Sequence, residues 1–530
     1  MKKSNIKKFI LKALSAPLSD IKSLEKIKKE FAIEEKEVFI KNAEINKVYF
    51  EMIKKGEVRS NETLRKLLIT KKIRTLSGVA VIAVLTKPSS CPGKCIYCPS
   101  EKNMPKSYLS NEPAVMRAIK TSFHPYKQVH ARMRALSLNG HSTDKLELIV
   151  MGGTFSHFPP QYQSWFIKEC FRAANDFPRN SLQKKGSVSL EKEKSRNEKA
   201  KNRIIGLTLE TRQDFITPKE LLKFRRFGAT RVEIGVQTIF DDVLKKNKRG
   251  HLTLATTKAT ALLKNAGFKV NYHLMPGMYG SNVKKDFMMF KTLFSDERFA
   301  PDLIKIYPCV VTNNSELFSL WRQGKYTPLT NSQNKQLLKK IKPIIPQYTR
   351  ITRLIRDIPE ESIIAGPNIS NMRQILQQEK VHCECIRCRE VRDDFTKKDK
   401  IILDRIDYKA SKGKEIFLQY VSPNKMKLYA MLRLRIPPKN NPLETIIPAL
   451  SGSALIREVH TFGKLAKIDK TDSSSPQHIG LGRKLLQKAE SISKEEFGFE
   501  KIAIISGVGV REYYKKFDYK LENEYMTKKL

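Results

Sequence analysis

Acidic residues are scarce in this 530-residue sequence, which has 54 Asp and Glu against 100 Lys and Arg. The formal net charge of +46 predicts an extended polyanion as a partner, with nucleic acid first and an anionic membrane surface as the weaker alternative. A general lysine surplus, unrelated to binding, is the remaining explanation. Long apolar runs are absent too. Because no run reaches about 18 residues, we expect no membrane-spanning helix.

Cysteine is also rare: there are eight, and six of them fall into two tight clusters. Residues 1–12 are basic but lack a continuous apolar core followed by a small-residue cleavage site, so they do not resemble a secretion signal. Clustered cysteines without such a signal favour metal binding in a reducing compartment over disulfides. We therefore expect a cytoplasmic protein with two metal sites.

The length predicts several units, since one domain usually has about 150 residues. Residues 1–75 carry apolar side chains at helical spacing, with lysines on much of the other face. This pattern predicts a basic helical region, which either clamps an RNA backbone or is ordinary solvated surface. We assign 76–342 to a barrel, 343–400 to a cysteine-rich linker and 401–530 to a final domain.

Apolar runs alternate with helix-length segments through the middle of the chain. Continuous β-branched runs in this arrangement are typical of parallel strands joined by crossover helices, so we predict an α/β fold with a full or partial (β/α) barrel. The hydrophilic, lysine-rich stretch 183–203 predicts a mobile loop, with an RNA contact as a further option. The runs are Val79 to Leu85, Leu146 to Met151, Ile204 to Leu209, Val232 to Val236, Val270 to Leu274 and Leu303 to Ile306.

The first cysteine cluster, Cys91, Cys95 and Cys98, follows the first of these runs. Three thiolates at Cys-x3-Cys-x2-Cys spacing can bind three irons of a 4Fe-4S cluster and leave the fourth iron open. The open iron is what S-adenosylmethionine (SAM) chemistry requires, and the motif resembles the radical-SAM signature. Structural thiols and half of a zinc site are the alternatives.

Several polar or glycine-rich segments begin where a predicted strand ends. In a barrel, the chemistry sits at the carboxyl ends of the strands. Each segment is also explained as an ordinary tight turn, but together they predict a rim that binds the cofactor. Its candidate residues are Gly152, Gly153, Glu210 and Gln237.

The second cysteine cluster, Cys383, Cys385 and Cys388, supplies three thiolates where tetrahedral zinc needs four ligands. We favour Cys309 as the fourth because it follows a predicted strand and would tether the linker to the barrel. Cys170 and His382 are the other candidates. An auxiliary iron-sulfur cluster and free thiols are the competing interpretations of this cluster.

The C-terminal region predicts a nucleotide-binding turn. Gln477, Gly480 and Gly482 lie before an amphipathic helix, and such a turn exposes backbone N–H groups to a pyrophosphate. The strand at Lys501 and the segment bearing Tyr514 follow. This order resembles the GNAT acetyltransferase fold, whose loop binds acetyl-CoA; a purely structural turn is the alternative.

A radical-SAM barrel followed by a GNAT domain resembles the family of the catalytic subunit of Elongator, a tRNA wobble-uridine carboxymethyl synthase. The likeness covers most of the chain from about Gly78 to Leu530, including the linker cysteines of its archaeal and bacterial branch. The stretches that carry it are Ile149 to Phe155, Glu210 to Arg212, Arg231 to Gln237, Arg356 to Pro359, Ile456 to His460 and Ile505 to Gly509.

The resemblance implies two cofactor sites and a radical reaction. Cys91, Cys95 and Cys98 would hold the 4Fe-4S cluster. A radical derived from SAM would take hydrogen from the methyl group of acetyl-CoA, and the resulting carbon radical would add to C5 of the wobble uridine. Lys145, His460 and Tyr514 are the candidate catalytic residues. The implied acetyl-CoA contacts are Lys145, Glu458, Val459, His460, Thr461, Leu481, Gly482, Arg483 and Tyr514.

The implied partners are tRNA and an electron-donor protein, and the sequence leaves monomer and homodimer open. Ser100 and Glu101 stand where family members commonly have two glycines, which changes the rim beside the cluster. The main alternative function is a protein lysine acetyltransferase with a structural iron-sulfur domain.

Overall fold

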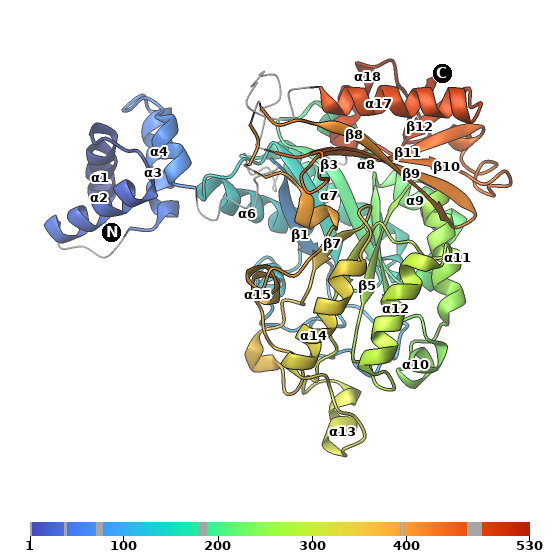
Figure 1. Cartoon of the computed structure of the whole chain (residues 1–530). Helices are drawn as coiled ribbons and strands as arrows, with labels where there is room; N and C mark the ends of the chain where they lie inside the picture. Colours follow the sequence, from blue (N-terminus) through green and yellow to red (C-terminus); the bar gives the residue numbers. More distant parts are fainter. Residues whose placement is uncertain are drawn as a thin grey trace.

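The computed structural model describes residues 3–35, 40–69, 78–179, 188–392, 394–396, 398–463 and 480–530. Figure 1 shows a lobe of N-terminal helices, a central unit built on a parallel sheet, and a C-terminal unit with its own sheet. None of the helices within these ranges is both long and apolar enough to cross a membrane.

The N-terminal lobe is helical, as predicted. Phe9, Phe31 and Tyr49 are buried where the helices pack together, while many lysines point outward. The capping box of Asp20 and Ser23 sets the start of the second helix. The helices are α1 (Lys3–Ser15), α2 (Ile21–Glu34), α3 (Asn42–Lys54) and α4 (Glu62–Leu67).

Seven parallel strands form the central sheet, in the order β1 to β7. The first and last strands are not hydrogen-bonded to each other, so the sheet is an open half-barrel, in line with the predicted fold class. All six predicted strands are present. The strands are β1 (Ala80–Leu85), β2 (Lys145–Met151), β3 (Arg203–Thr211), β4 (Arg231–Gln237), β5 (Lys269–Leu274), β6 (Leu303–Ile306) and β7 (Arg350–Arg353).

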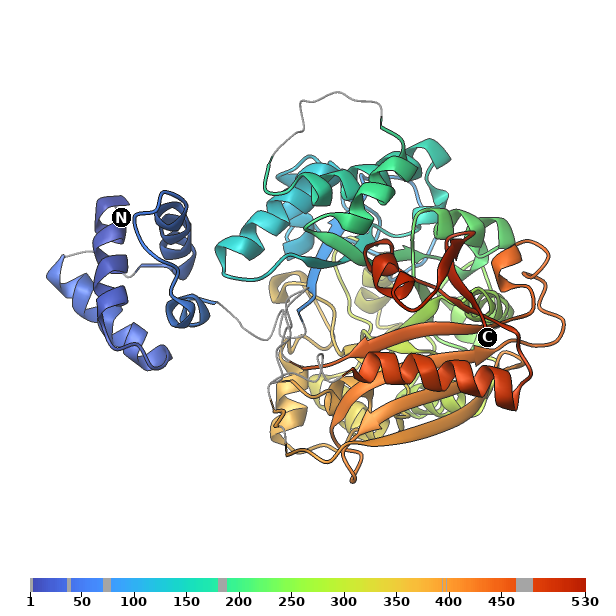
Figure 2. The ribbon, with the colours of Figure 1, turned by 90° about the horizontal axis from the view of Figure 1, so that it is seen from above.

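The helices of this unit mostly cover the outside of the sheet (Figure 2), but α13 (Glu316–Arg322) projects from the end of the molecule away from the C-terminal unit (Figure 1). They include α5 (Pro113–Ile119), α6 (Pro125–Leu138), α7 (Pro160–Asp176), α8 (Leu190–Lys199), α9 (Pro218–Arg226), α10 (Asp241–Lys246), α11 (Thr253–Asn265), α12 (Val283–Ser295), α13 (Glu316–Arg322) and α14 (Asn331–Ile341); α15 (Met372–Gln378) and α16 (Ile386–Arg389) follow β7.

Two elements differ from expectation. The seventh strand, β7, lies within the segment predicted to be linker, so the parallel sheet continues past residue 342. The stretch predicted to be a mobile loop contains α8, which begins at a Ser189 cap and buries Glu193, Lys194 and Asn197. That prediction is wrong for α8, because its polar residues have partners within the protein; residues 180–187 lie outside the described ranges.

The C-terminal unit is a mixed sheet with the order β13-β14-β12-β11-β10-β9-β8, covered by α17. Its β11 and β12 pair in parallel beside otherwise antiparallel neighbours. The elements are β8 (Ile402–Ala410), β9 (Gly413–Val421), β10 (Leu428–Ile436), β11 (Ser453–Thr461), α17 (Leu481–Ser491), β12 (Lys501–Ile504), α18 (Arg511–Lys515), β13 (Lys520–Glu522) and β14 (Tyr525–Lys529).

This unit packs against the amino ends of the barrel strands. A Cβ added to Gly507 would lie 2.0 Å from the carbonyl oxygen of Ile205, in the first half of β3, so only glycine permits this approach. Arg457 of β11 is fully buried and bonds to Asp302, just before β6, and to Glu415, 2.8 Å away. These paired buried charges fix the two units against each other.

Candidate active site

The loop of Cys91, Cys95 and Cys98 follows β1 at the carboxyl end of the half-barrel. Arg249 Nη1 lies 3.2 Å from Cys95 Sγ, and the Gly93 N–H lies 3.4 Å from Cys91 Sγ. Hydrogen bonding with Cys98 and the charge of Arg249 lower the pKa of Cys95 to about 5. A thiolate is the form that binds metal.

The surroundings of this loop suit an anionic cluster. Within the described ranges, the sulfurs of Cys383, Cys385 and Cys388 all lie within 4.8 Å of one another. The three sulfurs of the present loop do not form such a group. A buried nitrogen of Arg212, Nη1, has no hydrogen-bond partner and lies 2.3 Å from where a Cβ on Gly93 would be. Cations beside the thiols fit an anionic iron-sulfur cluster.

The predicted rim residues gather above this loop. Gly152 (φ +127°) and Gly153 (φ +95°) follow β2 with backbone angles that favour glycine. A Cβ on Gly152 would lie 2.0 Å from Thr86 Oγ1. Gln237 ends β4 at φ +66°, and its side-chain Oε1 is buried without a partner. Gly153 and Gln237 line the cavity, whereas Gly152 lies against Thr86.

Ser100 and Glu101, which replace two glycines, are tied into the neighbouring loop. The Ser100 N–H donates to the carbonyl of Asn314 at 2.7 Å, and the Glu101 carboxylate accepts from the N–H of Ser110 at 2.9 Å. A glycine at position 100 could donate the same backbone N–H, so the Glu101 carboxylate bond is the one of these two that depends on the side chain present here.

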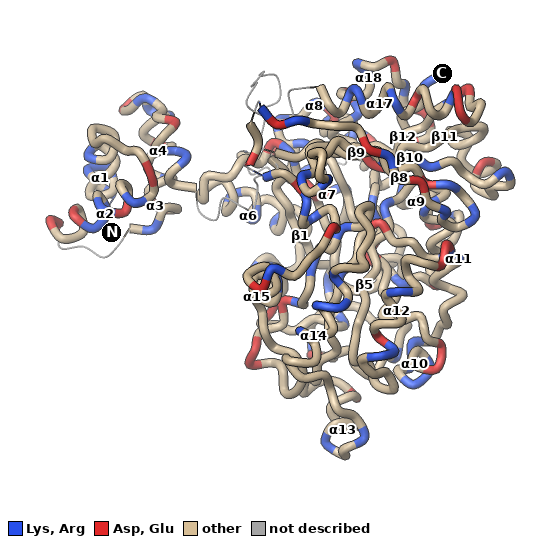
Figure 3. Tube along the Cα trace, in the orientation of Figure 1, with Lys and Arg blue, Asp and Glu red and all other residues tan. Residues whose placement is uncertain are grey.

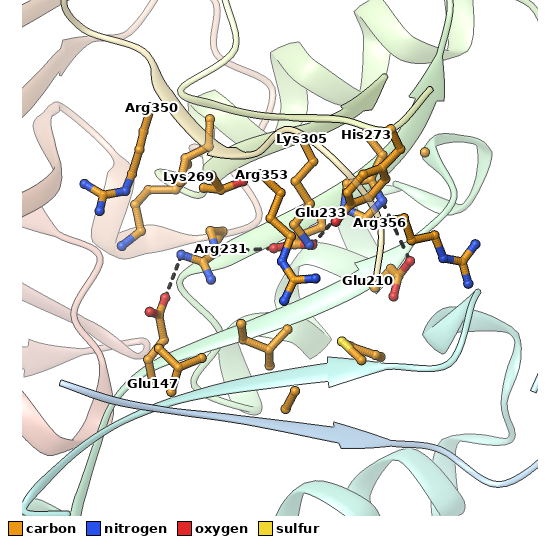
Figure 4. Close-up of a pocket in the computed structure, with 18 of the residues that line it drawn as sticks. Glu147, Glu210, Arg231, Glu233, Lys269, His273, Lys305, Arg350, Arg353 and Arg356 are labelled. Carbon is orange, nitrogen blue, oxygen red and sulfur yellow. Dashed lines mark hydrogen bonds and ion pairs between the residues drawn. The ribbon is translucent and has the colours of Figure 1, made fainter. Parts of the chain in front are cut away.

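Charged side chains line the barrel interior (Figure 4). His273 Nε2 lies 2.8 Å from Glu233, and Lys305 also pairs with this carboxylate. Arg231 bonds to Glu147 at 2.6 Å. Burial alone would raise the pKa of Glu233, but Lys305 and His273 hold it well below its usual value. The interior therefore presents fixed charges rather than an apolar plug.

Glu210 continues this lining toward the cysteine loop. Its carboxylate accepts a hydrogen bond from the hydroxyl of Tyr108 at 2.9 Å and lies 3.9 Å from His273 Nδ1. The Arg356 guanidinium lies 5.0 Å from the Tyr108 ring centroid and pairs with Glu112 at 2.9 Å. Glu210 is thereby aimed into the cavity from the end of β3.

The opposite end of the cavity reaches the C-terminal unit. Glu458 lies 2.9 Å from Arg433 and 3.4 Å from Lys269, which begins β5. Burial opposes ionisation, but these two cations lower the pKa of Glu458 to about 2. Burial lowers the pKa of His460 and raises that of Tyr514, so the imidazole is neutral and the phenol protonated at neutral pH.

One cavity of about 1070 Å³ joins these two ends through the half-barrel. Cys91, Cys95 and Cys98 line it at one end, and Glu458, Val459, His460 and Tyr514 line it at the other. Gly153, Glu210 and Gln237 also contribute to its wall.

Other predicted acetyl-CoA residues lie around this end without lining the cavity. Lys145 begins β2 opposite Arg203, and burial lowers its pKa. A Cβ on Gly482 would lie 3.5 Å from Thr461 Oγ1, which brings these two residues together. Gly480 caps α17 at φ +72°, followed by Leu481 and by Arg483, whose guanidinium lies 6.0 Å from the Phe517 ring. Gln477 lies outside the described residues.

The second cysteine group forms as predicted, except for its fourth member. The sulfurs of Cys383, Cys385 and Cys388 lie within 4.8 Å of one another at the start of α16. Hydrogen bonds within this group lower the pKa of Cys385 to about 2. Cys309 is not part of it, so that prediction is wrong: its thiol is buried beside Tyr326, on the side of the first cysteine loop.

Sequence reasoning missed Arg249, Lys305 and Tyr108 as residues of this site. Arg249 stands in a lysine-rich run, which hides its role, and Lys305 sits inside an apolar strand. A lone lysine among buried strand residues was the available signal, because an interior lysine needs an acidic partner.

Comparison with known proteins identifies the family. The Radical SAM superfamily model matches residues 88–290, and the Radical_SAM C-terminal domain model matches residues 301–381. The chain is 43% identical over 497 residues to the tRNA uridine(34) acetyltransferase of Methanocaldococcus infernus, covering 91% of each chain. It is 35% identical over 489 residues to Elongator complex protein 3 of Bos taurus, covering 88% of this chain and 87% of the relative.

The chain belongs to the Elongator complex protein 3 family. A solved structure titled as the archaeal Methanocaldococcus infernus Elp3 with an N-terminal deletion (1-46) agrees. It matches with a TM-score of 0.72 at 39% identity, and the match covers 86% of this chain and all of that one. Membership in this radical-SAM family implies a 4Fe-4S cluster and SAM, and the loop of Cys91, Cys95 and Cys98 is where the present residues fit them.

Proposed function

We propose that this chain is a tRNA-modifying enzyme that uses SAM and acetyl-CoA to place a carboxymethyl group on C5 of the wobble uridine. The observation that carries the proposal is the single cavity that connects the cysteine loop with the His460 and Tyr514 end. The names of the relatives, tRNA uridine(34) acetyltransferase and Elongator complex protein 3, support the same substrate.

The cysteine end of the cavity would generate the radical. Cys91, Cys95 and Cys98 would hold the 4Fe-4S cluster, which together with SAM supplies a carbon-centred radical when an electron is added. Gly153 would let SAM approach the backbone, Gly152 would hold the tight turn against Thr86, and Gln237 would offer its amide oxygen as an acceptor. The enclosing strands would exclude water from the reacting atoms.

The C-terminal end would bind and hydrolyse the acetyl thioester. The turn from Gly480 to Arg483 would hold the pyrophosphate at the start of α17, and Lys145 would approach from the barrel side. The neutral His460 imidazole would take a proton from the attacking water. The Tyr514 hydroxyl, which stays protonated, would donate to the leaving sulfur.

The RNA would enter at the open edge of the half-barrel, between β1 and β7. Arg117 and Arg132 line the cavity on the β1 side, and Arg387 and Arg392 line it beyond β7. An anticodon base is single-stranded, so it can be splayed into such an opening without breaking a duplex.

We further propose zinc at Cys383, Cys385 and Cys388 with a ligand from outside this group, and an electron-donor protein as a partner.

The test is anaerobic incubation of the reconstituted protein with SAM, a reductant, acetyl-CoA and tRNA, followed by nucleoside mass analysis. We expect 5-carboxymethyluridine from the unaltered protein and none from Cys95→Ala or without acetyl-CoA. Absence of the product from the iron-loaded protein would overturn the proposal. Acetylated protein lysines formed equally well by Cys95→Ala would instead support the acetyltransferase alternative.

A further inference from the structure

A patch of exposed cations surrounds the outer side of the cysteine loop. We call it the basic collar. It is formed by the loop itself, by α10 with the turn that follows it, and by α13. Figure 3 shows Lys and Arg in blue on α10 and α13, at the end of the molecule away from the C-terminal unit. The collar residues, all exposed, are Lys94, Lys245, Lys246, Lys248, Arg322 and Lys325.

The collar is positive because the nearby acids are already engaged. Asp242 pairs with Lys285 at 2.6 Å, and Glu316 pairs with Lys248 at 2.5 Å. Asp241 accepts a hydrogen bond from the N–H of Thr253. For the other five collar cations, the described part of the chain provides no carboxylate within ion-pair distance. Their charge is therefore available to an outside partner.

The elements that carry the collar directly contact the cysteine loop. The Ile96 N–H donates to the carbonyl of Asn247 at 3.4 Å, and the Leu317 N–H donates to the carbonyl of Ile96 at 2.8 Å. Arg249, one residue after Lys248, reaches Cys95 Sγ. A partner docked on the collar would thus be separated from the cluster ligands by about one layer of protein.

The collar lies outside the proposed substrate cavity. None of its six cations is among the residues that line this cavity, whereas Arg117, Arg132, Arg387 and Arg392 line it near the open edge of the half-barrel. Since the RNA base must enter the cavity, its phosphates are expected near that edge. The collar therefore suits a second partner, different from the tRNA substrate, that approaches the cluster from outside the cavity.

The collar also carries aromatic surface. Phe318 and Trp321 of α13 are only partly buried, with ring centroids 5.7 Å apart, and Arg322 stacks 5.9 Å from the Phe318 centroid. Aromatic residues and arginine are enriched in protein–protein interfaces. Phe318 and Trp321 would therefore give a docked protein apolar contacts beside the collar charges.

We propose that the basic collar is the docking surface for a small acidic protein that carries one electron to the cluster. The proposal rests on the proposed function, which requires a reductant. In the transfer, the carrier is oxidised by one electron and the group held by Cys91, Cys95 and Cys98 is reduced by one, with no atom exchanged. Small, charge-steered interfaces of this kind are typical of redox partners.

The test compares two electron sources for the same variant. In Lys245→Glu/Lys246→Glu/Lys325→Glu, 5'-deoxyadenosine formation supported by reduced flavodoxin should fall by roughly tenfold or more at low salt, because charge reversal slows steered association. Formation supported by dithionite, which needs no docking, should be unchanged. The matched control, Lys258→Glu/Lys488→Glu/Lys494→Glu, changes the same charge on exposed residues of α11 and at the end of α17 and should behave as the unaltered protein.

Binding is measured separately from turnover. Calorimetry should show weaker flavodoxin binding for the collar variant only, with tRNA affinity unchanged in both. Equal flavodoxin binding and rates in the two variants would overturn the proposal, and a selective loss of tRNA affinity in the collar variant would reassign the collar to RNA. Failure of the unaltered protein to modify tRNA with dithionite would instead count against the proposed function and leave the flavodoxin-binding comparison intact.

Discussion

At the scale of single residues, Gly152 tests the proposed SAM rim, because the turn that it forms against Thr86 leaves no room for a side chain. Its φ of +127° disfavours any other residue, and a Cβ would meet Thr86 Oγ1 at 2.0 Å. We expect Gly152→Ala to reduce SAM binding by roughly tenfold or more, since strain of this kind costs about 1–3 kcal/mol before the clash is counted. Equilibrium binding of SAM to the iron-loaded protein measures it.

The control for this prediction is Gly498→Ala. Gly498 also has a positive φ, +68°, but a Cβ there would meet nothing within 4 Å. It should lower stability slightly and leave SAM binding unchanged. If both variants bind SAM equally well, close approach at Gly152 is not what the site requires.

The second cysteine group allows a clean metal prediction. Cys385→Ser should remove the proposed zinc from the purified protein and leave the iron content unchanged, because Cys385 lies in the group at α16 and the proposed iron ligands lie in the loop after β1. Cys309→Ser is the matched control and should retain both metals. Metal analysis that shows iron falling in Cys385→Ser would identify an auxiliary cluster instead.

The cysteines also show how far residue patterns carry. Three-cysteine spacing predicted both groups because their ligands are close in sequence. The fourth zinc ligand would be distant in sequence, so the prediction of Cys309 depended on where the chain after β6 lies in the fold. The strand carries Cys309 to the cysteine-loop side, next to Tyr326, which no local pattern reveals.

At the scale of elements, Asp286 of α12 holds the loop that follows β5. Its carboxylate accepts hydrogen bonds from the Gly277 N–H at 2.7 Å and from the Ser281 hydroxyl at 2.6 Å. Burial raises the pKa of Asp286 to about 6. A folded-state pKa above the unfolded value favours folding at low pH, and this contribution is lost as pH rises from about 4 through 6.

Asp286→Asn should therefore stabilise the protein increasingly across this pH range. The gain should reach at most about 3 kcal/mol above pH 7, because each pKa unit corresponds to about 1.4 kcal/mol. Thermal unfolding of the two proteins between pH 4 and 8 measures the difference. Parallel curves at all pH values would show that Asp286 does not titrate in the folded state as stated.

Element prediction succeeded where burial was continuous and failed where polar residues were internally paired. The six apolar runs form strands, as predicted. The sequence of β7, Arg-Ile-Thr-Arg, has only Ile351 fully buried, so its residue pattern does not predict a strand. Likewise α8 has few apolar residues, and it is fixed by the pairing of Lys194 with Glu524 at 2.6 Å. Such contacts between distant segments are not visible in a single stretch of sequence.

At the scale of the whole molecule, tRNA is a proposed partner for the net charge of +46. We expect tRNA affinity to fall at least tenfold between roughly 50 and 200 mM salt, because each neutralised phosphate releases counterions. Fluorescence anisotropy with labelled tRNA across this range measures it. A flat response would show that the lysine surplus is not used for RNA.

For the whole molecule, we propose that one cavity brings acetyl-CoA, bound at the C-terminal end, to the radical generated at the group held by Cys91, Cys95 and Cys98. The most direct test is anaerobic turnover with tRNA, SAM and acetyl-CoA deuterated in the methyl group. We expect deuterium in the released 5'-deoxyadenosine and both acetyl carbons in the modified uridine. Modified uridine formed together with 5'-deoxyadenosine free of deuterium would contradict it.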